Sequence, residues 1–284
     1  MKLPFVLARR FVAGETFDES ISKVRYLNEH DIRVTLDLLG ENVKDRKTAD
    51  NTVESYISLL KNIDLAGLKS SISIKLTMIG LDIDEEYCKQ NLLRLLEQAR
   101  EQGSFVRIDM EGSDNTQVTI DIFKEALKEY GNEHVGIVLQ AYLHRSAKDV
   151  TELAALGADV RICKGAYKEP SRVALQNMRD IREAFKQYTA ILLDKTDFPR
   201  IATHDDELID WVKQYADENN IDKSRFEFQM LYGLREETMI DLTNSGYKTR
   251  VYVPYGTMWF PYFKRRLTER KENIFFVAKT MFKS

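Results

Sequence analysis

Short apolar runs alternate with amphipathic segments along the whole chain. Eight runs have the β-branched, aromatic and apolar composition that is typical of strands. Each step from one run to the next leaves room for one helix, so the pattern predicts successive βα units. The runs cover residues 33–38, 71–76, 105–110, 135–140, 159–163, 200–203, 225–229 and 249–253.

The segments between these runs repeat their apolar residues with the spacing of a helix. Residues at i, i+3, i+4 and i+7 form one stripe, which a helix needs in order to pack on a sheet. Ser146, three residues before Asp149, is expected to cap a helix, and Gly157 and Gly246 are expected to end two helices. The stripes are Val53, Tyr56, Ile57 and Leu60; Leu92, Leu95, Leu96 and Ala99; Phe123, Ala126, Leu127 and Tyr130; and Leu208, Trp211, Val212 and Tyr215.

Eight strands that alternate with helices favour an α/β fold, a (β/α)8 TIM-type barrel. The 284 residues are all used by this pattern, so we expect a single barrel domain over residues 1–284. An open doubly wound sheet is the alternative. The barrel is preferred because of the number of strands and because no GxGxxG follows the first strand.

Composition narrows the class of protein. Hydrophobic residues at 43% and charged residues at 31% are typical of a globular chain, and the net charge of −3 argues against nucleic acid as the partner. Cys88 and Cys163 lack the spacing of metal ligands or of a redox pair. We therefore expect no metal site, and we expect both thiols to be reduced in a cytoplasmic protein. No apolar run is long enough to span a membrane, so any membrane contact is expected to be peripheral.

Polar and ionisable residues stand at or just after nearly every predicted strand end. In a (β/α)8 barrel these ends meet at one mouth, where catalytic residues lie. The set therefore predicts an active site. Its members are Asp37, Glu41, Lys75, Asp109, Glu111, Gln140, Tyr142, Arg161, Lys164, Thr203, His204, Gln229, Tyr252 and Tyr255.

A further helical pattern follows the last strand, over residues 259–273. Tyr262, Arg265, Arg266 and Glu269 share one face of it. Two adjacent arginines can hold a small carboxylate through charge-assisted hydrogen bonds. A solvated basic face is one alternative, and a membrane-surface helix is another because residues 274–277 are apolar.

Several familiar chemistries lack their motifs. The chain has no nucleophile elbow, no HExxH and no P-loop, and its four histidines form no ligand cluster. Lys75 and Lys164 each stand at a strand end, where a Schiff-base lysine can act. A lysine-dependent aldolase barrel and a non-catalytic binding barrel therefore remain as alternatives.

Nine motifs carry a resemblance to one family. The sequence resembles the bacterial proline dehydrogenases of the monofunctional type along nearly its whole length. This resemblance implies a distorted (β/α)8 barrel with the last helix over its mouth and with FAD bound non-covalently. A flavoenzyme for hydroxyproline or another cyclic amino acid is the related alternative. The motifs are DLLGE (37–41), SIKLT (73–77), RIDMEGS (107–113), VLQAYL (138–143), VRICKGAYKE (160–169), ATHD (202–205), EFQMLYG (227–233), RVYVPYG (250–256) and YFKRRLTER (262–270).

The resemblance also implies an activity. It is the oxidation of L-proline to Δ1-pyrroline-5-carboxylate by hydride transfer to flavin N5, the first step of proline catabolism to glutamate. A membrane quinone is the implied electron acceptor. The apolar and basic composition of 274–282 makes it the candidate segment for a peripheral contact at the inner face of the cell membrane, and packing of its aromatic side chains on the barrel is the alternative. A separate pyrroline-5-carboxylate dehydrogenase is the implied partner for the next step.

Matching the motifs residue by residue assigns expected roles. Asp109 and Arg161 match catalytic positions: Arg161 reaches flavin N5, and Asp109 orients its neighbours or acts as a general base. The positions for the substrate carboxylate are Lys75, Arg265 and Arg266, and those that wall the proline ring are Leu231, Tyr252 and Tyr262. The positions that contact the flavin are Met110, Gln140, Arg161, Lys164, Gly165, Ala166, Thr203 and His204.

Overall fold

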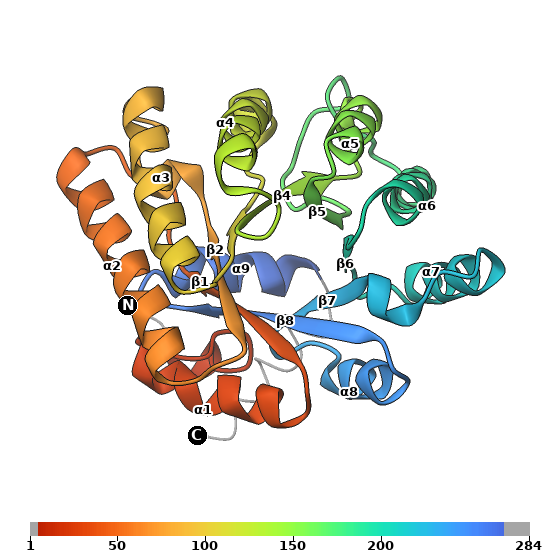
Figure 1. Cartoon of the computed structure of the whole chain (residues 1–284), viewed down its shortest axis with the longest axis horizontal. Coiled ribbons are helices and arrows are strands. Elements are labelled where there is room, and N and C mark those ends of the chain that lie inside the picture. Colours follow the sequence, from red (N-terminus) through yellow and green to blue (C-terminus); the bar gives the residue numbers. More distant parts are fainter. Residues whose placement is uncertain (1–4, 270–284) are drawn as a thin grey trace.

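Eight parallel strands close into a barrel, as Figure 1 shows. This computed structural model describes residues 5–269. Each strand pairs with the next one along the chain, and β8 pairs with β1, which confirms the predicted barrel and excludes the open sheet. The strands are β1 (Arg33–Leu38), β2 (Ser70–Ile74), β3 (Val106–Ile108), β4 (Val135–Gln140), β5 (Asp159–Cys163), β6 (Arg200–Ala202), β7 (Glu227–Leu231) and β8 (Lys248–Tyr255).

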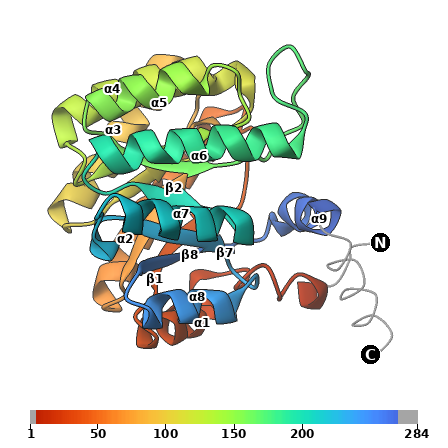
Figure 2. The same cartoon turned by 90° about the vertical axis from the view of Figure 1, so that its right-hand side faces the viewer.

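Helices surround the barrel and cover the outer face of the sheet (Figures 1 and 2). The four apolar stripes predicted from the sequence lie in α2, α3, α4 and α7, where most of their members are buried. The α-helices are α1 (Phe17–Glu29), α2 (Arg46–Leu65), α3 (Glu85–Glu101), α4 (Thr116–Tyr130), α5 (Ser146–Ala155), α6 (Met178–Lys195), α7 (Asp206–Glu218), α8 (Glu236–Asn244) and α9 (Trp259–Glu269). The 3-10 turns are η1 (Phe5–Leu7), η2 (Leu76–Met78), η3 (Ser113–Asn115) and η4 (Lys223–Arg225).

The structure corrects one predicted cap and several strand ends. Ser146 is not the N-cap of α5, because Arg145 holds that position and Ser146 Oγ instead donates to the carbonyl of Gln140 at 2.6 Å. Gly157 and Gly246 follow α5 and α8 with φ of 66° and 89°, as predicted for residues that end helices. Strands β1, β4 and β5 have the predicted bounds, whereas the other five differ by one to two residues at one end or both.

Polar residues fill the inside of the barrel. Along each strand, apolar side chains such as Val34, Leu36 and Ile72 face the helices and form the main hydrophobic core. The alternate residues face inward, as shown by the Arg250 side chain of β8, which reaches past β1 to Ser71 of β2 at 3.0 Å. Barrels of this class are usually filled by bulky branched apolar residues. Here polar residues take most of the inward positions, and the main apolar core lies between the sheet and the helices.

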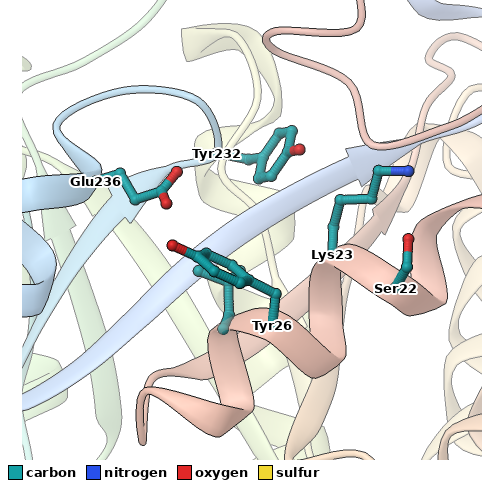
Figure 3. Close-up of a pocket in the computed structure, with 6 residues that line it drawn as sticks. Ser22, Lys23, Tyr26, Tyr232 and Glu236 are labelled. Carbon is teal, nitrogen blue, oxygen red and sulfur yellow. The ribbon is translucent and has the colours of Figure 1, made fainter.

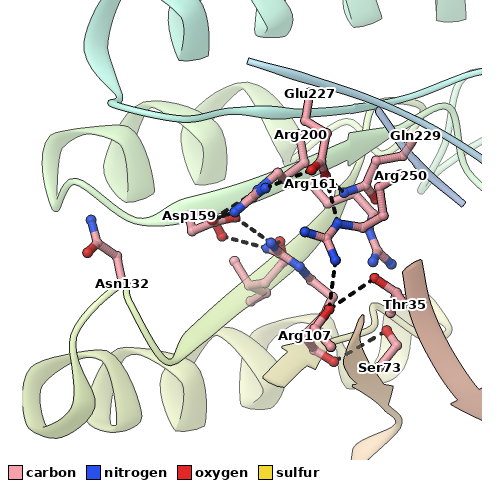
Figure 4. Close-up of polar contacts among 12 residues, drawn as sticks. Thr35, Ser73, Arg107, Asn132, Asp159, Arg161, Arg200, Glu227, Gln229 and Arg250 are labelled. Carbon is pink, nitrogen blue, oxygen red and sulfur yellow. Dashed lines mark hydrogen bonds and ion pairs between the residues drawn. The ribbon is translucent and has the colours of Figure 1, made fainter. Parts of the chain in front are cut away.

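Ion pairs run across this interior, as Figure 4 shows. Arg107 of β3 pairs with the Asp159 carboxylate of β5, and Arg200 of β6 reaches the same carboxylate at 2.7 Å. Arg200 also contacts Glu227 of β7 at 3.2 Å, and Glu227 accepts from Arg250 of β8 at 2.8 Å. Because a buried charge is costly without a partner, these residues depend on one another.

Gly136 of β4 provides the space that one of these arginines occupies. A Cβ atom at this position would stand 2.3 Å from Nη1 of Arg107 and 2.7 Å from the carbonyl oxygen of Asp159. Both are closer than van der Waals contact permits. The Arg107 guanidinium therefore lies against the backbones of β4 and β5, where Nη1 donates to the carbonyl oxygens of Ile137 at 3.0 Å and Asp159 at 2.7 Å.

Helix α9 lies across the mouth at the carboxyl ends of the strands (Figures 1 and 2). It begins four residues after β8 and forms a small second core with the N-terminal segment. The Trp259 ring meets the Phe5 ring at 5.7 Å, and the Phe263 ring meets the Phe11 ring at 6.3 Å. The prediction of a last helix over the barrel mouth is confirmed.

We expect Gly136→Ala to destabilise the protein by about 1–3 kcal/mol, because the added methyl group overpacks the interior and displaces Arg107 from its backbone acceptors. Gly112→Ala is the matched control, since a Cβ there meets nothing closer than Glu169 Oε1 at 3.8 Å. Denaturant unfolding of both variants provides the measurement. Equal midpoints for the two variants would contradict the role given to Gly136.

Candidate functional site

Asp109 is the centre of the polar cluster at the mouth. It follows β3, and one carboxylate oxygen, Oδ1, accepts from Ser73 at 2.6 Å and from Nη1 of Arg161 at 2.9 Å. The other oxygen, Oδ2, accepts from the Tyr252 hydroxyl at 2.8 Å. Burial, together with the Asp109 charge, raises the pKa of Tyr252, so this phenol stays protonated and donates. Asp109 thus holds Arg161 and Tyr252 in place, which favours an orienting role over that of a general base.

Lys75 forms a buried ion pair with Asp37. Its Nζ lies 3.0 Å from Asp37 Oδ1, and the two side chains are 8% and 1% exposed. Burial disfavours the ammonium, but the charges of Asp37 and Asp109 outweigh burial and raise the pKa of Lys75. A Schiff-base lysine must lose its proton before it attacks a carbonyl group. The ion pair of Lys75 therefore argues against the aldolase alternative.

Lys164 is also held by a carboxylate. Its Nζ lies 2.9 Å from Asp205 Oδ2, which Arg182 contacts at the same distance. Burial alone would raise the pKa of Asp205, but the hydrogen bonds from Arg182 and Lys164 lower it. The contact between Lys164 and Asp205 joins the ends of β5 and β6, and the backbone of Asp205 also donates to Thr203 Oγ1 at 3.2 Å.

Gln140 joins the end of β4 to two neighbouring loops. Its Nε2 donates to the carbonyl of Glu111 at 2.9 Å, and its Oε1 accepts from the backbone of Ala166 at 3.1 Å. Glu111 in turn accepts from the backbone of Thr77 at 3.1 Å and from its hydroxyl at 2.5 Å. Burial raises the pKa of Glu111, although the Thr77 contacts oppose the rise.

His204 has a defined orientation and tautomer. The backbone N–H of Leu231 donates to its Nε2 at 2.9 Å, so Nε2 carries no proton and the neutral ring carries its proton on Nδ1. The carbonyl of His204 accepts from Arg235, a residue with φ of 56° at the start of α8. The hydrogen bond between Leu231 and His204 brings predicted site residues from the ends of β7 and β6 into contact.

Gly165 is required by a close contact and by its backbone conformation. Its φ is 130°, and a Cβ would stand 2.4 Å from the Tyr142 ring. Gly165 and Ala166 are exposed, whereas Met110 is buried and Leu231 is half-buried. The loop after β5 therefore presents bare backbone at the mouth.

Helix α9 brings its predicted residues over this cluster. Arg265 Nη1 lies 3.1 Å from Glu41 Oε2, and the two side chains are 31% and 29% exposed. Arg266 and Tyr262 are buried, with the guanidinium 5.1 Å from the centre of the ring. The side chain of Glu269 and residues 274–282 lie outside the described part of the chain.

The sequence reasoning missed three residues of this cluster. Ser73 binds Asp109, Asp205 binds Lys164, and Tyr167 lies among Glu111, Lys75 and Arg265. Burial and Glu111 raise the pKa of Tyr167 to about 12. Ser73 stands two residues before Lys75 in the same strand run and therefore on the same face, which is a signal that the sequence contains.

A separate surface hollow lies away from this cluster, between α1 and the start of α8 (Figure 3). It contains no residue predicted for the site. Within residues 5–269 there is no helix long and apolar enough to cross a membrane and no group of metal-binding side chains. The residues that end the strands therefore remain the candidate site. The hollow is lined by Ser22, Lys23, Tyr26, Leu27, Tyr232 and Glu236.

Comparisons with known proteins agree on one family. The family model described as proline dehydrogenase matches residues 20–279. Proline dehydrogenase 2 of Bacillus subtilis (strain 168) is 43% identical over 278 residues, which cover 98% of this chain and 91% of that protein. Proline dehydrogenase of Deinococcus radiodurans is 39% identical over 280 residues, which cover 98% and 90%. Proline utilization A of Bdellovibrio bacteriovorus, solved after inactivation by N-propargylglycine, superimposes with a TM-score of 0.87 at 26% identity, over 93% of this chain and 32% of that one.

We expect the ring of His204 to carry its proton on Nδ1 when it is neutral, because Nε2 accepts from Leu231. A long-range 15N–1H correlation spectrum of the imidazole rings at mildly alkaline pH distinguishes the two tautomers. His144 is the internal control, since its Nε2 faces the carbonyl of Ser171 at 2.9 Å and must carry the proton. Finding both rings in the same tautomer would contradict the geometry of the mouth.

Proposed function

The chain belongs to the proline dehydrogenase family, and we propose that it oxidises L-proline to Δ1-pyrroline-5-carboxylate at the barrel mouth. Family membership makes it an oxidoreductase, and its relatives support a role in the first step of proline catabolism. The observation that carries the finer proposal is the arrangement of Asp109, Arg161 and Tyr252 beneath the α9 arginines.

The cations at the mouth provide a site for the substrate carboxylate. Lys75, Arg265 and Arg266 offer ammonium and guanidinium donors, which bind a carboxylate by charge-assisted hydrogen bonds. Arg265 is bound to Glu41 at a half-exposed position, so a substrate carboxylate exchanges with Glu41 or shares its arginine. Tyr252, Leu231 and Tyr262 would wall the ring.

The reaction breaks one C–H and one N–H bond of the ring and forms a C=N bond. The hydride leaves the ring carbon next to nitrogen, and the nitrogen lone pair must be free for this step, so the amine must be neutral. Cations that hold the carboxylate disfavour a second positive charge on the substrate nitrogen. Holding the ring in one orientation lowers the barrier further. Asp109 contributes by keeping Arg161 and Tyr252 in position.

The residues at the ends of β3, β4, β5 and β6 fit the flavin of FAD. Gly165 and Ala166 present exposed backbone, which allows a flat ring to approach closely. Arg161, Lys164 and the Nδ1 proton of His204 are donors beside it, and Met110, Gln140 and Thr203 complete the set. When bound, FAD supplies the two-electron acceptor for the hydride. Cys163 Sγ contacts the carbonyl of Leu139 at 3.6 Å and His204 Nε2 is occupied, which supports non-covalent binding.

A quinone at a membrane surface is the proposed electron acceptor, with pyrroline-5-carboxylate passing to a separate dehydrogenase. Three of the exposed apolar side chains lie near the mouth, on η1 and at the start of α9: Val6 at 51%, Met258 at 57% and Phe260 at 48%. The exposed Lys264 lies on α9 as well. An apolar and basic surface of this kind suits a peripheral contact with an anionic bilayer.

We expect the purified protein to be yellow and L-proline to bleach it in the absence of oxygen. A quinone analogue then restores the colour, and it does so faster when it is supplied in anionic vesicles than when it is free in solution. Acid precipitation leaves FAD in the supernatant. A colourless protein, a release of FMN, or a flavin that L-proline does not reduce would contradict the proposal.

We expect Arg265→Ala and Arg266→Ala to lower kcat/KM for L-proline by about 10- to 150-fold, because each removes a charge-assisted hydrogen bond worth about 1.5–3 kcal/mol. The flavin should stay bound in both variants. Steady-state kinetics with a soluble dye as acceptor provides the measurement.

Lys264→Ala is the matched control on the same helix, because Lys264 is exposed whereas Arg266 is buried. It should change kcat/KM little. If all three variants behave alike, α9 has a solvated basic face and no carboxylate site. Arg266→Lys keeps the charge and tests whether a loss in Arg266→Ala comes from misfolding.

A further inference from the structure

A small cavity lies inside the barrel, next to Arg161. Its volume is about 10 Å³ of space for the centre of the occupant, which is room for a single water molecule or one monatomic ion. Four arginines line it, together with two hydroxyl side chains from β1 and β2, the amide side chain of Gln229 from β7 and the ring of Phe105. The arginines and hydroxyl residues are Arg107, Arg161, Arg200, Arg250, Thr35 and Ser71.

Two buried N–H donors of this wall lack an acceptor. The Nε atoms of Arg107 and Arg161 have no hydrogen-bond partner within the described residues, although the side chains are only 2% and 6% exposed. Leaving a buried donor unpaired is costly. The remaining nitrogens of Arg107 are bound to Asp159 and Ile137, and Nη1 of Arg161 is bound to Asp109. The two Nε groups therefore need a hydrogen-bond acceptor in the cavity.

The charges around the cavity are unequal. Four guanidinium groups share three carboxylates, those of Asp109, Asp159 and Glu227, so one positive charge is in excess. None of these carboxylates lines the cavity. Burial lowers the pKa of Arg107 to about 10, and the charges of Arg161 and Arg200 add to this effect while Asp159 opposes it. An anion at this position would relieve both the repulsion and the excess charge.

We propose that the cavity binds a single halide ion, which is chloride under physiological conditions. A halide accepts hydrogen bonds from every side, so it can bind the two Nε groups together with one hydroxyl of Thr35 and Ser71, which are also hydrogen-bonded to each other at 3.2 Å. The small volume excludes sulfate, phosphate and carboxylates. The ion would hold Arg161 at Nε while Asp109 holds it at Nη1. The cavity shares Arg161 with the site proposed for L-proline, but halide binding does not depend on that activity and can be measured without it.

Diffraction identifies the occupant directly. Crystals of the full-length protein grown with chloride are transferred to bromide, and data are collected at the bromine absorption edge. We expect an anomalous peak between Nε of Arg107 and Nε of Arg161. Density without anomalous signal at this position would show that a water fills the cavity, and it would overturn the proposal.

Thermal unfolding tests the same site in solution. Chloride or bromide should raise the Tm by about 2–4 °C relative to gluconate at equal ionic strength, because an ion that binds only the folded state stabilises it. Thr35→Val removes one donor of the cavity with little change in volume. The halide concentration that gives half of the increase in Tm should therefore rise about tenfold. Ser71→Ala gives a second variant if Thr35→Val folds poorly.

Thr189→Val is the matched control, since Thr189 is fully buried on α6 and does not line the cavity. It should keep the complete halide effect. A wild-type Tm that is equal in halide and gluconate, or an equal loss in Thr35→Val and Thr189→Val, would overturn the proposal.

Discussion

The pairing of buried charges inside the barrel is the constraint on which the rest of this structure depends. Arg107, Asp159, Arg200, Glu227 and Arg250 come from five different strands, so the pairs form only when these strands have come together. Burial alone would raise the pKa of Glu227, but Arg250 and Arg200 lower it to about 2. A lowered pKa means that this carboxylate stabilises the fold above the unfolded value near 4.3 and that the contribution is lost as the pH falls toward 2.

This interior also explains how the mouth is kept in order. The inward residues continue upward along the same strands, from Asp159 to Arg161 on β5 and from Arg250 to Tyr252 on β8. Asp109 then joins Arg161 to Tyr252 across the mouth. The site is thus the last layer of a polar network that begins at the bottom of the barrel. An apolar interior would hold the strands together equally well but would give Arg161 no polar surroundings below it.

The strands and helices could be predicted because each depends on a local pattern. The apolar stripes of α2, α3, α4 and α7 and the strand runs need only neighbouring residues. The inward polar layer is also visible in the sequence, as alternation in runs such as RVTLDL and DVRIC. The pairing of these residues was not predictable, since Asp109 and Tyr252 are 143 positions apart and any inward cation fits any inward carboxylate. Ser146 failed as a cap because its hydroxyl binds Gln140, a contact that the cap pattern does not reveal.

The mouth adds one more consequence of charge pairing. Lys75 is bound to Asp37, Arg161 to Asp109 and Arg265 to Glu41, so each of these cations already has a carboxylate partner before any ligand binds. The first two pairs are largely buried, whereas Arg265 and Glu41 keep about a third of their surface in solvent. Exchange of a carboxylate is cheapest where water can solvate the one that leaves. Among these three cations, Arg265 is therefore the one whose carboxylate partner can exchange without exposing a buried charge, and the deeper pairs can stay intact while it does.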